Sequence, residues 1–205
     1  MSRVKLSLLM VVGLPVNRRV LSLDIIFDLG GVVLTWDPKA IIAGVFVDEA
    51  SQALVLSEVF GHSDWVELDR GTMPVDVAIA GAVSRTGLPE ADLARMFRRV
   101  PLALVPIPQM LDLLHRLKTR GHSLYCLSNL HANSFAHLKA EYLFWEIFDG
   151  AVISCLAHLC KPEPAIYAHM LESFRLSGPE TVFIDDMEAN LDAAKPFGLR
   201  TIRFV

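Results

Sequence analysis

The sequence predicts an α/β fold, in which a doubly wound, Rossmann-like parallel sheet forms the core and carries an all-helical cap insertion. Short apolar runs of strand type alternate along the chain with stretches of helical periodicity, a pattern typical of doubly wound proteins. The strand runs are continuously apolar rather than alternating, as expected of strands that helices cover on both faces. With 205 residues, of which 53% are hydrophobic, the chain is long enough for one such core and a substantial insertion.

Residues 1–20 are interpreted as a leader of uncertain role ahead of the first core strand. An apolar run over 6–16 is interrupted by a serine, a glycine and a proline. The run resembles a weak signal-peptide core, which makes secretion an alternative, but Arg18 and Arg19 stand where cleavage would occur. Because the run is far shorter than the ~20 residues needed to cross a bilayer, no membrane partner is expected.

Five apolar runs predict the strands of the core. They cover 23–27, 123–127, 151–154, 181–184 and 200–204. Three helices are predicted among them, over 109–121, 163–176 and 188–198. The first ends at Gly121, a common helix stop, and Pro196 marks the end of the third.

Residues 38–105 interrupt this alternation, because they show three helical stretches separated by Gly, Pro and Asp turns and no persuasive strand. The simplest explanation is a helical cap inserted just after the first strand. A proline-rich stretch over 100–108 is interpreted as the linker that returns to the core. The expected domains are therefore a core over 21–37 and 106–205, with the cap over 38–105 between its two parts.

Charge and cysteine content narrow the function classes. A formal net charge of −4 gives no sign of a polyanion-binding surface, so nucleic acid is not an expected partner. The three cysteines form no CxxC pair, which favours reduced core thiols in a cytoplasmic protein. A zinc site would need a fourth ligand beside Cys155, His158 and Cys160.

Polar residues follow four of the predicted strands where each strand ends. They are Asp28, Ser128 with Asn129, Lys161 after a short loop, and Asp185 with Asp186. Ligands of open parallel sheets bind at the carboxyl ends of the strands, so these side chains are expected to meet at one site.

This set of residues fits phosphoryl transfer. A carboxylate such as Asp28 can accept a phosphoryl group and later yield it to water. Because a carboxylate repels an anionic phosphate, cations are needed: a divalent metal held by Asp28 and one acid of the 185–186 pair, and the ammonium of Lys161. The hydroxyl of Ser128 and backbone N–H groups beside the glycines would bind phosphate oxygens.

Four motifs carry a resemblance to a known family. "IIFDLGGVV", "YCLSN", "KPEPAIY" and "VFIDDMEAN" occur in this order and frame the core from about residue 23 to 204. The chain resembles the haloacid dehalogenase-like (HAD) hydrolase superfamily, subfamily IA with a helical cap. Its motifs look most like those of the α-D-glucose-1-phosphatase-like branch. The helical segment stands at the cap insertion point that this resemblance implies.

The resemblance implies Mg²⁺ as the cofactor and a role for each matching position. Asp28 corresponds to the nucleophile, which also binds the metal, and Gly30 to the residue whose backbone carbonyl reaches the metal. Ser128 corresponds to the phosphate-binding hydroxyl, with Asn129 beside it, and Lys161 to the phosphate-stabilising lysine.

The fourth motif supplies the remaining expected residues of the site. Asp186 best matches the metal ligand, whereas Asp185 and Asn190 are expected in the outer shell or against metal-bound water. For Asp185, a purely structural role as a buried hydrogen-bonding partner is an equal alternative.

Gly30 departs from the family pattern, since most phosphatases of the superfamily carry a second Asp there as general acid and base. Such assistance is typically worth about 10²–10⁴ in rate. Three outcomes are open: another group or water takes the role of the missing Asp, the substrate has an easier leaving group such as an anomeric or acyl phosphate, or the protein is nearly inactive. The branch that the chain resembles shares this glycine, which favours the first two outcomes. Asp37, at the cap entrance, is a speculative substitute.

Several of these residues also have a purely structural alternative. Ser128 and Asn129 are candidates for the N-cap of a helix that begins at His131, and Lys161 for a solvated surface residue. In the cap, the stretch 61–74 holds Trp65, Glu67, Asp69 and Arg70 before a Gly turn, and of these the arginine or the tryptophan is a candidate for contact with a sugar or acid. A packed tryptophan beside a salt-bridged turn is favoured there. His62, His131 and His137 are interpreted as surface or packing residues.

The function predicted from the sequence is a Mg²⁺-dependent phosphatase that hydrolyses a small phosphorylated metabolite, with a sugar phosphate preferred, through an aspartyl-phosphate on Asp28. The expected protein is a monomer or weak dimer. One alternative is a metal-free 2-haloacid dehalogenase. The other is a catalytically weak binding protein on the same scaffold, because Gly30 replaces the usual acid.

Overall fold

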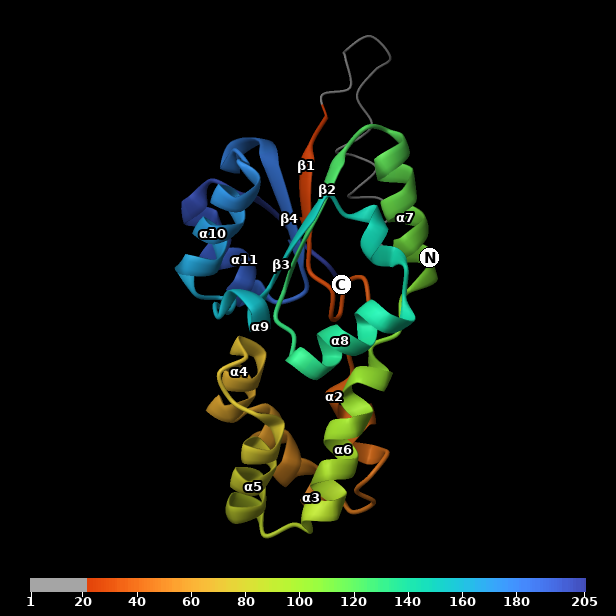
Figure 1. Ribbon diagram of the computed structural model, residues 1–205, viewed down its shortest axis with the longest axis vertical. Helices are drawn as coiled ribbons and strands as arrows, with labels where there is room; N and C mark the ends of the chain where they lie inside the picture. The colour runs from red at the N-terminus through yellow and green to blue at the C-terminus, as the bar shows by residue number, and fades with distance from the viewer. Residues whose placement is uncertain (1–21) are drawn as a thin grey trace.

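A five-stranded parallel sheet forms the centre of the molecule. A computed structural model describes residues 22–205, so the predicted leader lies outside the described residues (Figure 1). The strand order is β3-β2-β1-β4-β5, and every neighbouring pair is parallel. The strands are β1 (Asp24–Phe27), β2 (Ser123–Ser128), β3 (Gly150–Ile153), β4 (Thr181–Asp185) and β5 (Arg200–Arg203). This topology confirms the predicted doubly wound α/β fold.

The central strand β1 places the start of the site at the middle of the sheet. It pairs with both β2 and β4, and Phe27 stands level with Cys126 on one side and Ile184 on the other. Because the strands are parallel, the residues that follow them emerge at the same edge.

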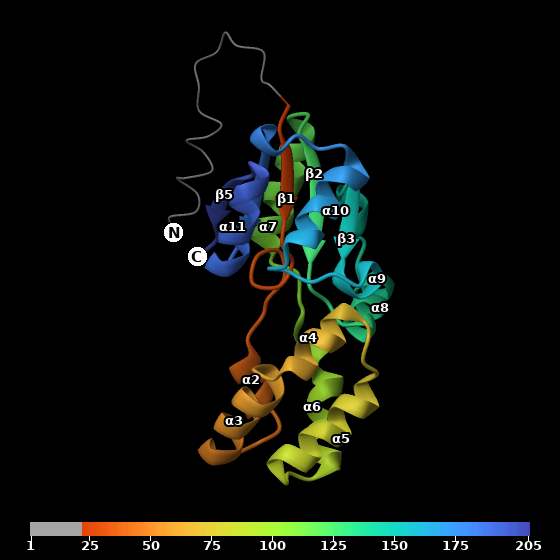
Figure 2. The same ribbon diagram turned by 90° about the vertical axis from the view of Figure 1, so that its left-hand side faces the viewer.

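Helices cover both faces of the sheet, as Figures 1 and 2 show. Ile25 and Phe27 pack into one hydrophobic cluster with α7 (Pro108–Thr119) and α8 (Ala132–Glu141). Ile26, which points the opposite way, packs with α10 (Pro164–Phe174) and α11 (Glu188–Ala194). The burial of consecutive residues on both faces explains why the strand runs are continuously apolar. Short elements complete the core: α9 (Ser154–Ala157), η2 (Phe144–Ile147), η3 (Gly178–Glu180) and η4 (Lys195–Phe197).

The predicted core elements differ from the observed ones mainly at their ends. The run 151–154 was expected to be a strand throughout, but Ser154 begins α9 instead. The helix predicted over 188–198 is α11 followed by the 3₁₀ turn η4, because Pro196 has no N–H to continue the α-helical hydrogen bonds. The three cysteines are buried and unpaired, as predicted.

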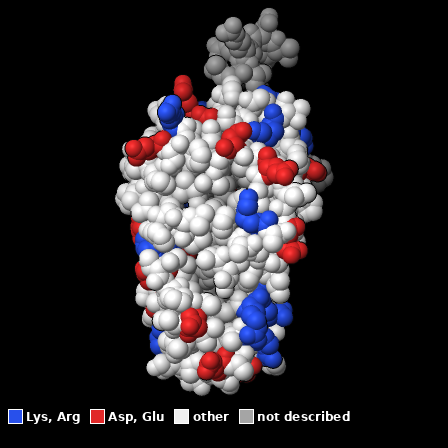
Figure 3. Space-filling model, viewed as in Figure 1, with Lys and Arg blue, Asp and Glu red and all other residues white. Residues whose placement is uncertain are grey.

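The cap helices lie beyond the carboxyl edge of the sheet and form their own hydrophobic cluster (Figure 2). They are α2 (Pro38–Ala43), α3 (Glu49–Val55), the π-helix η1 (Leu56–Phe60), α4 (Ser63–Arg70), α5 (Val75–Thr86) and α6 (Glu90–Ala103). The helix α6 continues through Pro101, so the return linker is shorter than the stretch 100–108 that was predicted. On the face in Figure 3, charged side chains are spread over the surface, and basic ones gather at the cap end.

The two linkers between core and cap are hydrogen-bonded to each other. The Oγ1 of Thr35 donates to the carbonyl of Ala103 at 2.7 Å and accepts from the N–H of Val105 at 3.0 Å. The N–H of Thr35 donates to the carbonyl of Val105 at 2.9 Å. The chain therefore leaves and re-enters the core at one point. No helix within residues 22–205 has both the length and the apolar character needed to cross a bilayer.

Candidate active site

The carboxyl ends of the strands and the cap enclose a cavity of about 320 Å³. Its lining includes Asp28 after β1, Asn129 after β2, Lys161 after β3 and Asp186 after β4, whereas Ser128 and Asp185, which the sequence predicted at the same site, are not lining residues. Gly30 and Asn190 also line it. The volume lies within the range of small-molecule sites, about 300–1,000 Å³.

Lys161 is buried between two carboxylates. Its Nζ lies 2.9 Å from Oδ1 of Asp28 and 2.7 Å from Oδ2 of Asp185. Burial alone would lower the pKa of the ammonium, but the two carboxylates outweigh it and raise the pKa above its ordinary value. Lys161 is therefore a permanent cation, and the structure rejects the alternative of a solvated surface lysine.

Asp28 is held at the floor of the cavity. Its Oδ1 accepts a hydrogen bond of 2.6 Å from the N–H of Leu29 as well as the contact with Lys161. Burial raises the pKa of Asp28 to about 6; Lys161 opposes the shift and Asp185 adds to it. The carboxylate is thus fixed in place and supplied with positive charge, as a nucleophile at an anionic centre requires.

Three carboxylates suit a hard divalent cation. Asp28, Asp185 and Asp186 each offer an oxygen, and these oxygens lie within 4.8 Å of one another. Oxygen donors of this kind are the ligands that Mg²⁺ prefers. Gly31 stands so close to Asp186 that a Cβ on this glycine would lie 2.5 Å from Oδ2 of the carboxylate. The residues present therefore fit a metal site.

The two neighbouring acids of the fourth motif differ in their surroundings. Asp185 is fully buried and accepts hydrogen bonds from the N–H of Met187, the side chain of Asn190 and Lys161. Asp186 is half-buried, and its side chain forms no hydrogen bond to any other residue in the described part of the chain. Burial also raises its pKa. Asp186 therefore has oxygens available to a cation, whereas those of Asp185 orient its neighbours.

The side chain of Asn129 is hydrogen-bonded within the site, whereas that of Ser128 is not. The side-chain amide of Asn129 donates to the carbonyl of Lys161 and accepts from its N–H, both at 2.9 Å. Asn129 thereby holds the loop that carries the lysine. Ser128 is 1% exposed, and its hydroxyl has no hydrogen-bond partner among residues 22–205. The N-cap position of α8 is His131, so the alternative that Ser128 or Asn129 caps this helix is wrong.

Gly30 lines the cavity, although the space around it would also admit a residue with a side chain. A Cβ at Gly30 would meet its nearest neighbour, Trp36, at 3.7 Å, an ordinary van der Waals distance. Asp37, the speculative substitute for the missing acid, is exposed and accepts from the N–H of Ala40 as the N-cap of α2. Asp37 is not among the residues that line the cavity.

The cap contributes an aromatic and aliphatic wall. Trp65, Val100 and Leu104 of the cap line the cavity, together with Trp36 of the segment that leads into it. Trp65 packs against the neighbouring aromatic rings, with Trp36 at 6.2 Å between ring centroids. It also contacts the ring of His131 at 4.3 Å.

Asp69 and His131 also line this cavity, and sequence reasoning missed both of them there. Asp69 was assigned to a salt-bridged turn, but its neighbour Arg70 forms the ion pairs, with Glu163 and Glu67. One signal was available in the sequence. Asp69 stands four residues after Trp65 in a helix, so a cavity-facing tryptophan implies a cavity-facing carboxyl.

Burial keeps the Asp69–His131 pair uncharged near neutral pH. Oδ1 of Asp69 lies 3.3 Å from Nε2 of His131 without forming a hydrogen bond to it, and their side chains are 14% and 10% exposed. Burial raises the pKa of Asp69 to about 8, a shift that Lys161 opposes and Asp28 increases, and burial lowers the pKa of His131 to about 4. Asp69 therefore carries a proton at pH 7, while the imidazole carries no charge.

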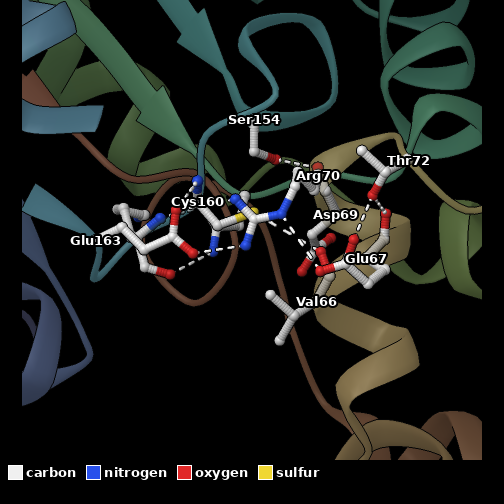
Figure 4. Close-up of polar contacts among 10 residues, drawn as sticks. Val66, Glu67, Asp69, Arg70, Thr72, Ser154, Cys160 and Glu163 are labelled. Carbon is white, nitrogen blue, oxygen red and sulfur yellow. Dashed lines mark hydrogen bonds and ion pairs between the residues drawn. The ribbon is translucent and has the colours of Figure 1, made fainter. Parts of the chain in front are cut away.

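The end of α4 docks on the core through several polar contacts, which Figure 4 shows. The guanidinium of Arg70 donates to the carboxylate of Glu163 at 2.5 and 2.9 Å. The hydroxyl of Ser154 donates to the carbonyl of Asp69 at 2.5 Å. The Nδ1 of His158 lies 2.9 Å from the carbonyl of Arg70. These contacts fix the backbone of Asp69 against the site.

Comparison with known proteins identifies a family. A family model described as haloacid dehalogenase-like hydrolase matches residues 25–198. The sequence is 33% identical over 174 residues to Sesquiterpene phosphatase astK of Aspergillus oryzae, with 85% of each chain covered.

Solved structures share the fold. The HAD family enzyme bt-2542 of Bacteroides thetaiotaomicron has a TM-score of 0.70 at 21% identity, over 89% of this chain and 93% of that chain. A further structure of that enzyme contains magnesium and inorganic phosphate. L-2-haloacid dehalogenase of Xanthobacter autotrophicus has a TM-score of 0.66 at 20% identity, over 89% of this chain and 77% of that one.

Proposed function

The chain belongs to the haloacid dehalogenase-like hydrolases, and from this membership we propose that it is a Mg²⁺-dependent phosphatase acting through an aspartyl-phosphate on Asp28. The observation that carries the proposal is the buried Lys161, which contacts both Asp28 and Asp185 beside Asp186. A buried cation next to a carboxylate cluster is suited to an anionic substrate that a carboxylate must approach.

Each site residue has a role in this reaction. Asp28, Asp186 and the backbone carbonyl of Gly30 would hold Mg²⁺, which supplies charge neutralisation for the phosphate. Lys161 neutralises further charge, and its loop is held by Asn129. The unpartnered hydroxyl of Ser128 would donate to a phosphate oxygen, while Asp185 and Asn190 orient the lysine and the α11 end of the site.

The cap wall favours a substrate whose alcohol part is largely apolar. Trp36, Trp65, Val100 and Leu104 offer aromatic and aliphatic surface, beside which Asp69 and His131 are the polar side chains. A sugar placed against this surface would lose hydration at several hydroxyls and regain few partners, which costs about 1–3 kcal/mol for each unpaired group. A terpenoid alcohol would instead bury apolar surface. The similarity to a sesquiterpene phosphatase supports the same choice.

A substrate panel tests the proposal. Phosphate release is measured from farnesyl phosphate, glucose 1-phosphate and p-nitrophenyl phosphate, with Mg²⁺ and with EDTA. We expect Mg²⁺-dependent release, with the highest kcat/KM on farnesyl phosphate. Dominant turnover of glucose 1-phosphate would restore the sugar phosphate predicted from the sequence. Chloride release from a 2-haloacid without Mg²⁺ would favour the dehalogenase alternative. Binding of Mg²⁺ and phosphate without turnover of any substrate would favour the non-enzymatic alternative.

The substitution Asp28→Asn is expected to abolish release from every substrate, a loss of at least about 10³-fold, because it removes the nucleophile. Asp24→Asn is the matched control. Asp24 lies at the other end of the same strand, away from the cavity, and this variant should keep wild-type activity. Equal activity of the two variants would contradict the assignment of Asp28.

A further inference from the structure

The proposed reaction lacks a proton donor at the usual place. Expulsion of an alkoxide from an alkyl phosphate is difficult unless the leaving oxygen is protonated as the P–O bond breaks. Gly30 has no side chain that can supply this proton, and Asp37 lies outside the cavity.

We propose that Asp69, carried by cap helix α4, is the general acid and base of this enzyme, and that His131 positions its carboxyl group. This inference rests on the proposed phosphatase function. It assigns to a cap residue the task for which the strand β1 has no side chain.

Elimination among the titratable groups of the cavity supports Asp69. Asp28 and Asp186 are committed to the nucleophile and the metal. Lys161 is ion-paired with two carboxylates, which makes its ammonium a weak acid. Within residues 22–205, the remaining titratable groups that line the cavity are Asp69 and His131, and burial leaves the imidazole uncharged at neutral pH. Asp69 is the group that holds a transferable proton there.

The position of Asp69 suits a fixed donor rather than a mobile surface acid. Its side chain is largely buried, Nε2 of His131 lies 3.3 Å from its Oδ1, and its own carbonyl accepts from Ser154 (Figure 4). The ion pair between Arg70 and Glu163 anchors the next residue of the helix to the core. The acid is therefore in place only when the cap is docked.

The two half-reactions balance with Asp69 as acid and then base. In the first, Oδ of Asp28 attacks phosphorus and the P–O bond to the alcohol breaks. The electron pair stays on the ester oxygen, which takes the proton of Asp69 and leaves as the alcohol. In the second, the Asp69 carboxylate takes a proton from water, whose oxygen attacks phosphorus. The bond from phosphorus to Asp28 then breaks, so that phosphate is released and both carboxyl groups return to their starting states.

Leaving-group dependence distinguishes this role from a structural one. The experiment compares Asp69→Asn with wild type on farnesyl phosphate, n-hexyl phosphate and 2,4-dinitrophenyl phosphate. We expect kcat/KM for n-hexyl phosphate to fall about 10²–10⁴-fold. For 2,4-dinitrophenyl phosphate, whose leaving group needs no proton, aspartyl-phosphate formation measured as the burst of dinitrophenol should change less than about fivefold. Steady-state turnover of that substrate should slow at the water step.

Two further variants keep the test decisive. Asp64→Asn, on the same helix but paired with Arg85 inside the cap, should retain its activity on both leaving groups. Gly30→Asp combined with Asp69→Asn should recover at least tenfold on n-hexyl phosphate, because the space at Gly30 admits a side chain. Circular dichroism and thermal melting establish that each variant is folded.

The pH profile gives an independent readout. Groups facing Asp69 are His131, Lys161 and Asp28, with the thiols of Cys155 and Cys160 nearby. Burial raises the pKa of Asp69 to about 8, so its proton is present below that pH and lost above it. The kcat/KM for n-hexyl phosphate should therefore fall as the pH rises through about 8, and the 2,4-dinitrophenol burst should lack this decline.

The inference and the proposed function can fail separately. Equal losses of Asp69→Asn on all leaving groups, or no loss on any, would overturn the role of Asp69 while phosphatase activity stands. Failure of the wild type to release dinitrophenol from the activated ester with Mg²⁺ would instead overturn the proposed function.

Discussion

Gly31 illustrates how one residue without a side chain shapes the candidate metal site. Its backbone has φ of +76°, a left-handed conformation, and the carboxylate of Asp186 occupies the space where its Cβ would be. A side chain at this position would therefore have two separate effects. The left-handed backbone would strain any residue other than glycine, whereas the steric clash would arise from Asp186. The second glycine of "IIFDLGGVV" thus serves the fourth motif, about 155 residues further along the chain.

Gly31→Ala is expected to lower the affinity for Mg²⁺ by at least tenfold, because the new methyl group displaces Asp186. The left-handed backbone adds a stability cost of about 1–2 kcal/mol. Gly87→Ala is the control, since Gly87 has φ of +68° and no atom lies within 4 Å of the place its Cβ would take. It should show the stability cost in urea unfolding but no change in Mg²⁺ affinity by isothermal titration calorimetry. Equal Mg²⁺ affinities for both variants would show that Asp186 is not a ligand.

The sequence predicts the location of a site residue when that residue follows a strand of the parallel sheet. Asp28, Asn129, Lys161 and Asp186 line one cavity because parallel strands end at one edge, a rule that the sequence pattern reveals. Asp69 was not placed there, since its position depends on how the cap helices dock, which involves contacts far apart in the sequence.

At the scale of elements, α4 connects the cap to the core. Its ion pair between Arg70 and Glu163 spans 93 residues of sequence, and the pair lies between the end of α4 and the start of α10 (Figure 4). The same loop carries Lys161 two residues earlier. A single ion pair thus links the docking of the cap to the loop that positions the phosphate-binding lysine.

A double-mutant cycle of Arg70→Gln and Glu163→Gln tests this link. Each variant should lower kcat/KM for alkyl phosphates by about three- to thirtyfold, and the double variant should be little worse than either single one. This pattern corresponds to a coupling energy of about 0.5–2 kcal/mol. Arg95→Gln, which breaks the exposed pair with Asp92 inside α6, is the control and should leave kcat/KM unchanged. Fully additive effects of the two substitutions would argue against coupling.

The elements themselves were predicted from periodicity, and their ends were less accurate. All five predicted strands and all three predicted core helices were found, because buried apolar runs and Gly or Pro stops are local signals, but α8 and the short α9 were not among the predicted helices. The limits at Ser154 and Pro101 were missed. At Ser154 the helix α9 begins directly after β3, without a Gly or Pro between them, and at Pro101 the helix tolerates proline in its last turn.

At the scale of the whole molecule, the cap and the core are separate hydrophobic clusters joined by two linkers. Thr35 bonds one linker to the other through its hydroxyl and its N–H. Because the linkers are tied together, the cap is expected to move about one axis, with Thr35 near that axis. The division into core and cap domains stays a prediction of the sequence.

Thr35→Val is expected to loosen this connection, because valine keeps the shape and removes both hydroxyl hydrogen bonds. We expect kcat and KM for alkyl phosphates to change together by about two- to tenfold, while the stability falls by only about 1 kcal/mol at an exposed site. Thr119→Val is the control, since its hydroxyl donates to the carbonyl of His115 within α7 and has no other partner among residues 22–205. Steady-state kinetics and urea unfolding measure the two effects, and an unchanged kcat and KM would place the axis elsewhere.

The pairing of the linkers at Thr35 has a consequence for how such proteins diversify. Since the chain departs from and returns to the core at adjacent, hydrogen-bonded points, a different segment of almost any length could close the same gap at little entropic cost. We therefore expect that the segment 38–105 could be replaced by that of a relative without disturbing the strand order. In this chain such an exchange would also remove Asp69, so a graft that alters substrate preference would carry its own proton chemistry with it.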